Sequence, residues 1–141
     1  MFDIIKSWRT KSLLRKQLLA FLDEMEKNLE IFYVMDQRQF IIHGYSMDVW
    51  EKVKDLNIIK SQEAIKTYAV DLIAFNNAFK EHKEYEKWYT SDVQNKNVEN
   101  GKKLHDLKNK LDARIKPLEA VIIAAGQALE KELLNLGFIN N

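Results

Sequence analysis

The longest apolar repeat in the chain lies between residues 98 and 136. Its apolar residues recur every three or four positions, which places them on one face of an α-helix and differs from the two-residue repeat of a strand. They are Leu104, Leu107, Leu111, Ile115, Leu118, Ile122, Ala125, Leu129, Leu133 and Leu136. A helix of this length needs neighbours to cover its apolar face, so the repeat predicts a helical bundle.

Similar spacing predicts three further helices. The first covers residues 11–42. A short helix over residues 47–55 follows, with Ser46 as its N-cap, because a hydroxyl can accept a hydrogen bond from an amide of the first turn. Another long helix covers residues 62–89, with Ser61 as its N-cap.

The last helix contains a proline and ends at a glycine. It begins near Asn95 or only after Gly101, and Pro117 predicts a kink within it because proline removes one backbone hydrogen bond. Gly137 can adopt the left-handed conformation that ends many helices, with Phe138 folding back on Leu133. The predicted fold is an all-α antiparallel bundle of three long helices plus one short helix, the last helix kinked near Pro117.

The chain is predicted to form one domain over residues 1–141, a length that buries a single core. Four glycines and one proline provide little turn chemistry, which favours a few long elements. Residues 1–10 are the exception, since their apolar positions fall out of register with the repeat that follows. They can form a separate amphipathic segment.

Charge and cysteine content exclude several classes of protein. The formal net charge is +1, which gives no overall field that attracts nucleic acid. The chain has no cysteine, so disulfides, thiolate metal sites and a cysteine nucleophile are excluded, and a reducing cytoplasm is the expected compartment. No apolar run reaches the roughly 20 residues that span a bilayer, and no signal peptide is expected.

Sequence motifs for catalysis, cofactors and metals are lacking. The residues three positions before the histidines are Phe40, Phe79 and Lys102, so the Glu-x-x-His motif of di-iron bundles does not occur. The chain has no HExxH motif, no glycine-rich phosphate loop and no Gly-x-Ser-x-Gly elbow. His82 and Glu86 can share a helix face, which is a weak indication of a metal ligand pair. We therefore expect no enzyme activity, no cofactor and no metal.

A nearly uncharged stretch, residues 118–129, is the first candidate for an interaction surface. Its small residues are Ala120, Ala124, Gly126 and Ala128, and they allow another backbone to approach closely. The alternative is that this stretch is simply the central helix of the bundle, covered by its own neighbours. The first reading predicts a protein partner or self-association.

The N-terminal segment is the second candidate. It combines apolar and basic residues that suit a membrane interface or a docking partner: Phe2, Ile5, Lys6, Trp8 and Arg9. Residues 1–20 contain five basic residues and one acidic residue. In the alternative interpretation, the apolar side chains pack over the end of the bundle.

Two further interpretations have less support. Aromatic residues with nearby lysines can stack nucleic-acid bases, but the helical spacing of these aromatics favours core packing, and nucleic acid is not an expected partner. A pocket between helices near His43, Tyr45 and Trp50 can accommodate a small ligand. The sequence thus predicts a non-enzymatic module for protein–protein interaction or assembly. The alternatives are a peripheral membrane protein and a small-ligand-binding bundle.

Overall fold

The computed structural model describes residues 2–38 and 43–140, with side chains for residues 9–37 and 43–140. Within these ranges the protein is all-α, and no strand occurs. The helices are α1 (Phe2–Arg38), α2 (Asp48–Val53), α3 (Asn57–Lys60), α4 (Glu63–Ser91), α5 (Val98–Ala113) and α6 (Leu118–Asn135), with a short 3-10 helix, η1, at Val93–Asn95.

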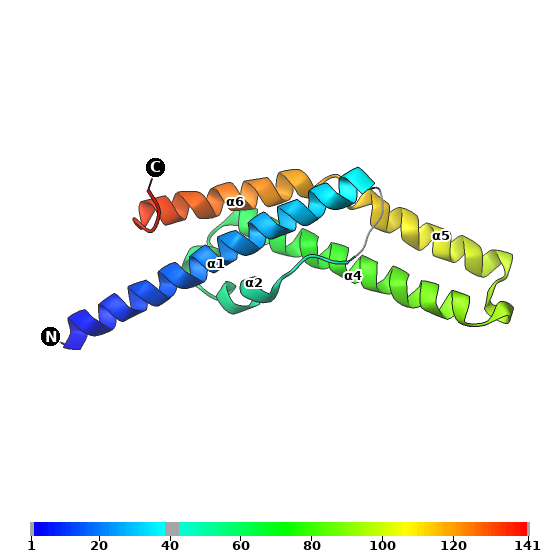
Figure 1. The fold of residues 1–141 in the computed structure, drawn as a ribbon, viewed down its shortest axis with the longest axis horizontal. Coiled ribbons are helices and arrows are strands. Elements are labelled where there is room, and N and C mark those ends of the chain that lie inside the picture. Colours follow the sequence, from blue (N-terminus) through cyan, green and yellow to red (C-terminus); the bar gives the residue numbers. More distant parts are fainter. Residues whose placement is uncertain (1, 39–42, 141) are drawn as a thin grey trace.

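Helix α6 lies at the centre of the packing. It contacts α1 and α4, whereas α5 packs on α4 and α2 packs on α1. Figure 1 shows α5 and α6 running antiparallel to both α1 and α4. Helices α1 and α4 run in the same direction, because the connection through α2 and α3 returns along the bundle before α4 begins.

The molecule is elongated. In Figure 1 the hairpin of α4 and α5 extends beyond α1 and α6 at one end, and the N-terminal part of α1 projects from the other. At about 1.5 Å per residue, the 37 residues of α1 span roughly 55 Å. The far part of the hairpin is a two-helix structure, and none of the residues from 76 to 106 is fully buried.

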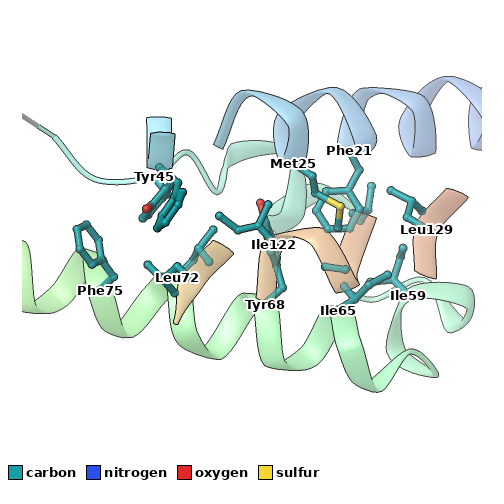
Figure 2. Close-up of a cluster of buried hydrophobic side chains, with 14 of the residues drawn as sticks. Phe21, Met25, Tyr45, Ile59, Ile65, Tyr68, Leu72, Phe75, Ile122 and Leu129 are labelled. Atoms are coloured by element: carbon teal, nitrogen blue, oxygen red, sulfur yellow. The ribbon is translucent and has the colours of Figure 1, made fainter. Parts of the chain in front are cut away.

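The core forms where α1, α4 and α6 meet, and the predicted apolar repeats supply it (Figure 2). Its fully buried members include residues from all three helices: Leu18, Phe21, Ile65, Tyr68, Leu72, Phe75, Ala125, Leu129 and Leu133. Fully burying a large apolar side chain contributes about 1.5–3 kcal/mol relative to exposure. In the last repeat Leu104 and Ile115 are only half-buried. Leu136 is 41% exposed, because α6 ends before it.

The predicted bend at Pro117 is confirmed. Residues 114–117 form a turn between α5 and α6. Within it the amides of Arg114 and Ile115 donate to carbonyls three residues earlier, over 3.0 and 3.2 Å. The predicted end of the last helix is also confirmed, since Gly137 has a φ of 73° and the Phe138 amide donates to the Leu133 carbonyl over 2.9 Å. This pair of features forms a Schellman motif.

Several predicted boundaries differ from the structure. Two short helices, α2 and α3, replace the single short helix expected over residues 47–55, since α2 ends at Val53 and α3 begins at Asn57. Ser46 and Ser61 are not N-caps; those positions belong to Met47 and Gln62, and neither side chain makes a capping hydrogen bond. Helix α1 begins at Phe2, so the backbone of residues 2–10 continues into it.

Candidate functional site

Two buried polar side chains of α1 organise the segment between α1 and α2. Glu24 is 5% exposed and Asn28, one turn later, is fully buried. A buried polar group without a hydrogen bond costs about 1–3 kcal/mol, so each is expected to have partners. Both find them in residues 44–50, the connection that leads from α1 into α2.

Glu24 caps the first turn of α2. Its carboxylate accepts hydrogen bonds from the Val49 amide over 2.8 Å, the Trp50 amide over 3.1 Å and the Ser46 hydroxyl over 3.0 Å. An acidic group near a helix N-terminus also interacts favourably with the helix dipole. The cap that Ser46 was expected to provide therefore comes from a residue more than twenty positions away.

Asn28 and Asn76 hold the extended residues before α2. Asn28 accepts from the Ser46 amide over 3.0 Å, and its Nδ2 donates to the Ser46 carbonyl over 2.8 Å and to the Tyr68 hydroxyl oxygen over 2.7 Å. Asn76 on α4 pairs in the same way with Tyr45: it accepts from the amide over 2.7 Å and donates to the carbonyl over 3.0 Å. Each asparagine side chain thus pairs with both the amide and the carbonyl of one residue in this segment, as a neighbouring β-strand would.

Tyr45 inserts its ring between the helices (Figure 2). The ring packs edge-on against Phe75, with centroids 5.1 Å apart. Its hydroxyl oxygen is buried and finds no hydrogen-bond partner among the described residues. Burial raises the pKa of both Tyr45 and Tyr68 above the usual value for tyrosine, so both phenols are neutral at physiological pH.

The polar cluster of Glu24, Asn28 and Asn76 forms hydrogen bonds with backbone groups of the same chain. The atoms of Glu24, Asn28 and Asn76 that could act on a substrate already hold residues 45–50. The Ser46 hydroxyl donates to Glu24 over 3.0 Å, but the same carboxylate oxygen also accepts from the Val49 amide and so is committed to the backbone of α2. The arrangement therefore supports a structural role for the cluster, which fixes the return of the chain along α1.

The residues predicted to line one ligand pocket are separated. Tyr45 lies in the core, whereas His43 is exposed beside Met35 on α1, and its Nδ1 lies 2.8 Å from the Gly44 carbonyl oxygen. Trp50 lines a different groove, on the side of α3 and α4. The predicted His82–Glu86 pair shares a face of α4, with Nε2 and Oε2 4.0 Å apart. No group of three potential ligands suited to a metal occurs in the described part of the chain.

The four small residues of α6 do not lie on one surface. Ala120 and Ala124 are exposed, Ala128 packs against the core, and Gly126 lines a groove between α6 and α1. A Cβ placed on Gly126 would meet no atom within 4 Å, so close packing within this chain does not require glycine there. The outer side of α6 is therefore centred on Ala120 and Ala124.

The N-terminal candidates fall largely outside the described side chains. These are Phe2, Ile5, Lys6 and Trp8; for them only the helical backbone is described. Arg9, the last of the five, is exposed. Just beyond it Leu13 is 58% exposed.

The aromatic residues divide between the core and the hairpin. Phe75 is buried, and Tyr85 lies between α4 and α5, where its hydroxyl donates to the Asn100 carbonyl over 3.3 Å and the Lys103 ammonium stands 5.0 Å from its ring. Trp88 is 45% exposed, and Val93 and Val98 near the tip are 82% and 90% exposed. Most of these rings are thus engaged in packing.

Sequence reasoning overlooked Glu24, Asn28 and Asn76. Asn28 offered a signal, because it follows Met25 by three residues and precedes Phe32 by four, so it occupies a core position of its helix. A polar residue at such a position usually has a specific partner. Glu24 and Asn76 lie beside core positions and resemble ordinary surface residues.

Comparisons with protein-family models, with curated proteins and with solved structures gave no match for this chain. Separately, none of the described helices combines the length and the apolar character needed to cross a membrane.

Proposed function

We propose that this protein is a non-enzymatic interaction module that assembles with a protein partner, a second copy of itself in the simplest case, through the outer side of α6. The observation that carries the proposal is the scarcity of charge on that side. Between residues 118 and 129 the exposed residues are Ala120, Ala124 and Gln127, and the only charged residue, Glu119, is half-buried.

The other helices have the outer surfaces expected of solvated helices. Most of the exposed residues of α5 are charged: Glu99, Lys102, Lys103, Asp106, Lys108, Lys110 and Asp112. A helix that faces water normally has such a polar side. Residues 118–129 of α6 contrast with this, although charge returns at the exposed Glu130 and Lys131, and no described residue covers Ala120 and Ala124.

Small side chains favour a helix as the partner. Ala120 and Ala124 lie one turn apart, and alanine lets helix axes approach to the short end of the usual 8–10 Å. Two copies of α6 related by a two-fold axis would present the same surface to each other, which is the commonest geometry of homodimers. The proposed compartment is the cytoplasm, which suits a chain without cysteine.

Analytical ultracentrifugation over micromolar concentrations tests the proposal. We expect concentration-dependent dimerisation of the natural protein, and at least a tenfold weaker association for Ala124→Arg. Because Ala124 is exposed, this variant should keep its thermal stability. The matched control is Ala20→Arg on the exposed side of α1, which should associate normally. Two results together would refute the proposal. The natural protein is monomeric at every concentration, and no partner protein is found that binds the natural protein but fails to bind Ala124→Arg.

A second candidate function, docking on an anionic membrane surface, is favoured by the start of α1. This end projects from the bundle (Figure 1). It exposes Leu13 among the basic residues Arg9, Lys11 and Lys16, a combination that suits a membrane interface. Flotation with phosphatidylglycerol vesicles tests this candidate: deletion of residues 1–9 combined with Leu13→Glu should abolish binding, and binding that survives both changes excludes this segment.

A further inference from the structure

A groove of about 300 Å³ opens between the α2–α3 turn and the start of α4. Its apolar lining includes Ile59 and Ile65, which are 3% and 1% exposed and so form a rigid floor. Trp50, which is half-buried, and Val70, which is 65% exposed, add to that lining. Val70 therefore adds exposed apolar surface beside this floor.

All the charged residues that line this groove are lysines. They are Lys54, Lys60 and Lys66, and none of the described lining residues is acidic. Lys54 pairs with Glu51 over 2.9 Å, and Lys66 pairs with Glu63 over 3.2 Å. Both pairs are exposed and join residues three apart on a helix, an arrangement worth only about 0.3–0.5 kcal/mol, so either lysine can exchange its partner at little cost.

One further contact and one lysine without an ion pair place positive charge at the groove. The Lys54 ammonium stands 5.4 Å from the centroid of the Trp50 ring, which brings it to the apolar lining. Lys60, the last residue of α3, makes no ion pair with any described residue. A groove whose lining combines apolar side chains with three lysines is complementary to a molecule that has one anionic head and one hydrocarbon tail.

We propose that this groove binds a free single-chain anionic amphiphile, namely a medium-chain fatty acid. The carboxylate would lie among the three lysines, and the alkyl chain would cover Trp50 and Val70, above the buried Ile59 and Ile65. Each methylene that leaves water contributes about 0.8 kcal/mol. The volume lies at the lower limit of small-molecule sites, about 300–1,000 Å³, so it fits one short chain better than a two-chain lipid.

Isothermal titration calorimetry with dodecanoate, below its critical micelle concentration, tests the proposal. The protein is kept dilute enough to be monomeric, so that the outcome is independent of association through α6. We expect saturable binding, amide shifts in nuclear magnetic resonance spectra confined to residues near 50–70, and tighter binding of dodecanoate than of octanoate. Dodecyltrimethylammonium, which has a tail of the same length and the opposite charge, should bind at least tenfold more weakly.

Two substitutions locate the site. Val70→Glu places a carboxylate in the lining and should weaken dodecanoate binding at least tenfold, whereas Lys60→Gln should weaken it about threefold. Both side chains are exposed, so the fold should be kept. The matched control is Val98→Glu, at a valine that is 90% exposed near the tip of the α4–α5 hairpin and should leave binding unchanged.

Three results would overturn the proposal. The first is no saturable binding of dodecanoate. The second is equal binding of the anionic and cationic amphiphiles, or equal loss in Val70→Glu and Val98→Glu, either of which indicates unspecific adsorption. The third is binding to phosphatidylglycerol vesicles that Val70→Glu abolishes, without binding of free dodecanoate, which would assign the groove to a membrane surface.

Discussion

Asn76 holds the backbone of Tyr45 at both of its polar groups. The side-chain oxygen accepts from the Tyr45 amide over 2.7 Å, and the side-chain nitrogen donates to the Tyr45 carbonyl over 3.0 Å. The neighbouring Gly44 makes this approach possible, because a Cβ at residue 44 would lie 2.5 Å from the Asn76 oxygen. The two residues therefore act as a unit that ties the α1–α2 connection to α4.

This relationship predicts coupled effects on stability. Asn76→Ala should lower the free energy of unfolding by about 2 kcal/mol, since two hydrogen bonds of about 1 kcal/mol each are lost. Gly44→Ala should cost about 1–3 kcal/mol alone and much less in the Asn76→Ala background, where the clash is absent. Urea denaturation of the four proteins measures the coupling, and Asn77→Ala, at an exposed neighbour, is the control. Additive effects would contradict the prediction.

Glu24 is predicted to be the most important polar residue of α1. Glu24→Ala removes the acceptor of three hydrogen bonds and leaves the α2 amides unpaired, which should cost about 3 kcal/mol. Glu24→Gln keeps one acceptor oxygen and should cost less. The amide signals of Val49 and Trp50 should shift most in both variants. Glu26→Ala, at an exposed position of the same helix, should change stability by less than about 0.5 kcal/mol.

The α4–α5 hairpin is predicted to open locally. Its residues 76–106 include none that is fully buried, and few apolar contacts resist local unfolding there. Amide hydrogens around Tyr85 and Leu104 should therefore exchange faster than those around Leu72 and Ile122, which are buried in the core. Native-state hydrogen exchange measures the difference. Equal protection of the hairpin and the core would show that the two regions unfold together.

The apolar positions of the core were predictable because they follow from local spacing alone. Leu118, Ile122 and Leu129 lie at helical intervals, and the structure buries all three. The bend at Pro117 and the end of the last helix at Gly137 were predictable for a similar reason. Pro117 and Gly137 act through their own backbone geometry, whatever surrounds them.

The polar cluster was not predictable from local spacing. Glu24 and Asn28 meet partners 18 to 40 residues away, and those partners come into reach only after the chain has turned back along α1. The short helices were misassigned for the same reason. Ser46 resembles an N-cap in the sequence, but its hydroxyl donates to Glu24, which provides the cap itself.

The two buried tyrosines should respond in opposite ways to loss of their hydroxyl groups. The Tyr45 hydroxyl has no partner among the described residues, so Tyr45→Phe should raise the free energy of unfolding by up to about 1 kcal/mol. Tyr68→Phe removes the acceptor of the 2.7 Å hydrogen bond from Asn28 and should lower it by about 1 kcal/mol. Urea denaturation at neutral pH checks both. Destabilisation by Tyr45→Phe would reveal a partner for its hydroxyl.

The same tyrosines predict a loss of stability at high pH. Burial raises the pKa of Tyr45 and of Tyr68 in the folded protein, whereas an unfolded chain has tyrosine pKa values of about 10. Below pH 10 both the folded and the unfolded state keep the phenolic protons, so tyrosine ionisation does not change the free energy of unfolding. Above pH 10 the unfolded state releases protons that the folded state retains, so the free energy of unfolding falls as pH rises.

The slope of the free energy of unfolding against pH identifies the tyrosines as the origin of this loss. Each buried tyrosine should contribute a decrease of about 1.4 kcal/mol per pH unit above pH 10. Tyr45→Phe removes one contribution, so the stability difference between this variant and the natural protein should grow steadily from pH 10 to pH 11. Lysines titrate in the same range, but they are common to both proteins and cancel in the difference. Urea unfolding at pH 9, 10 and 11 measures it, and a difference that stays constant would mean that Tyr45 ionises as readily in the folded protein as in the unfolded chain.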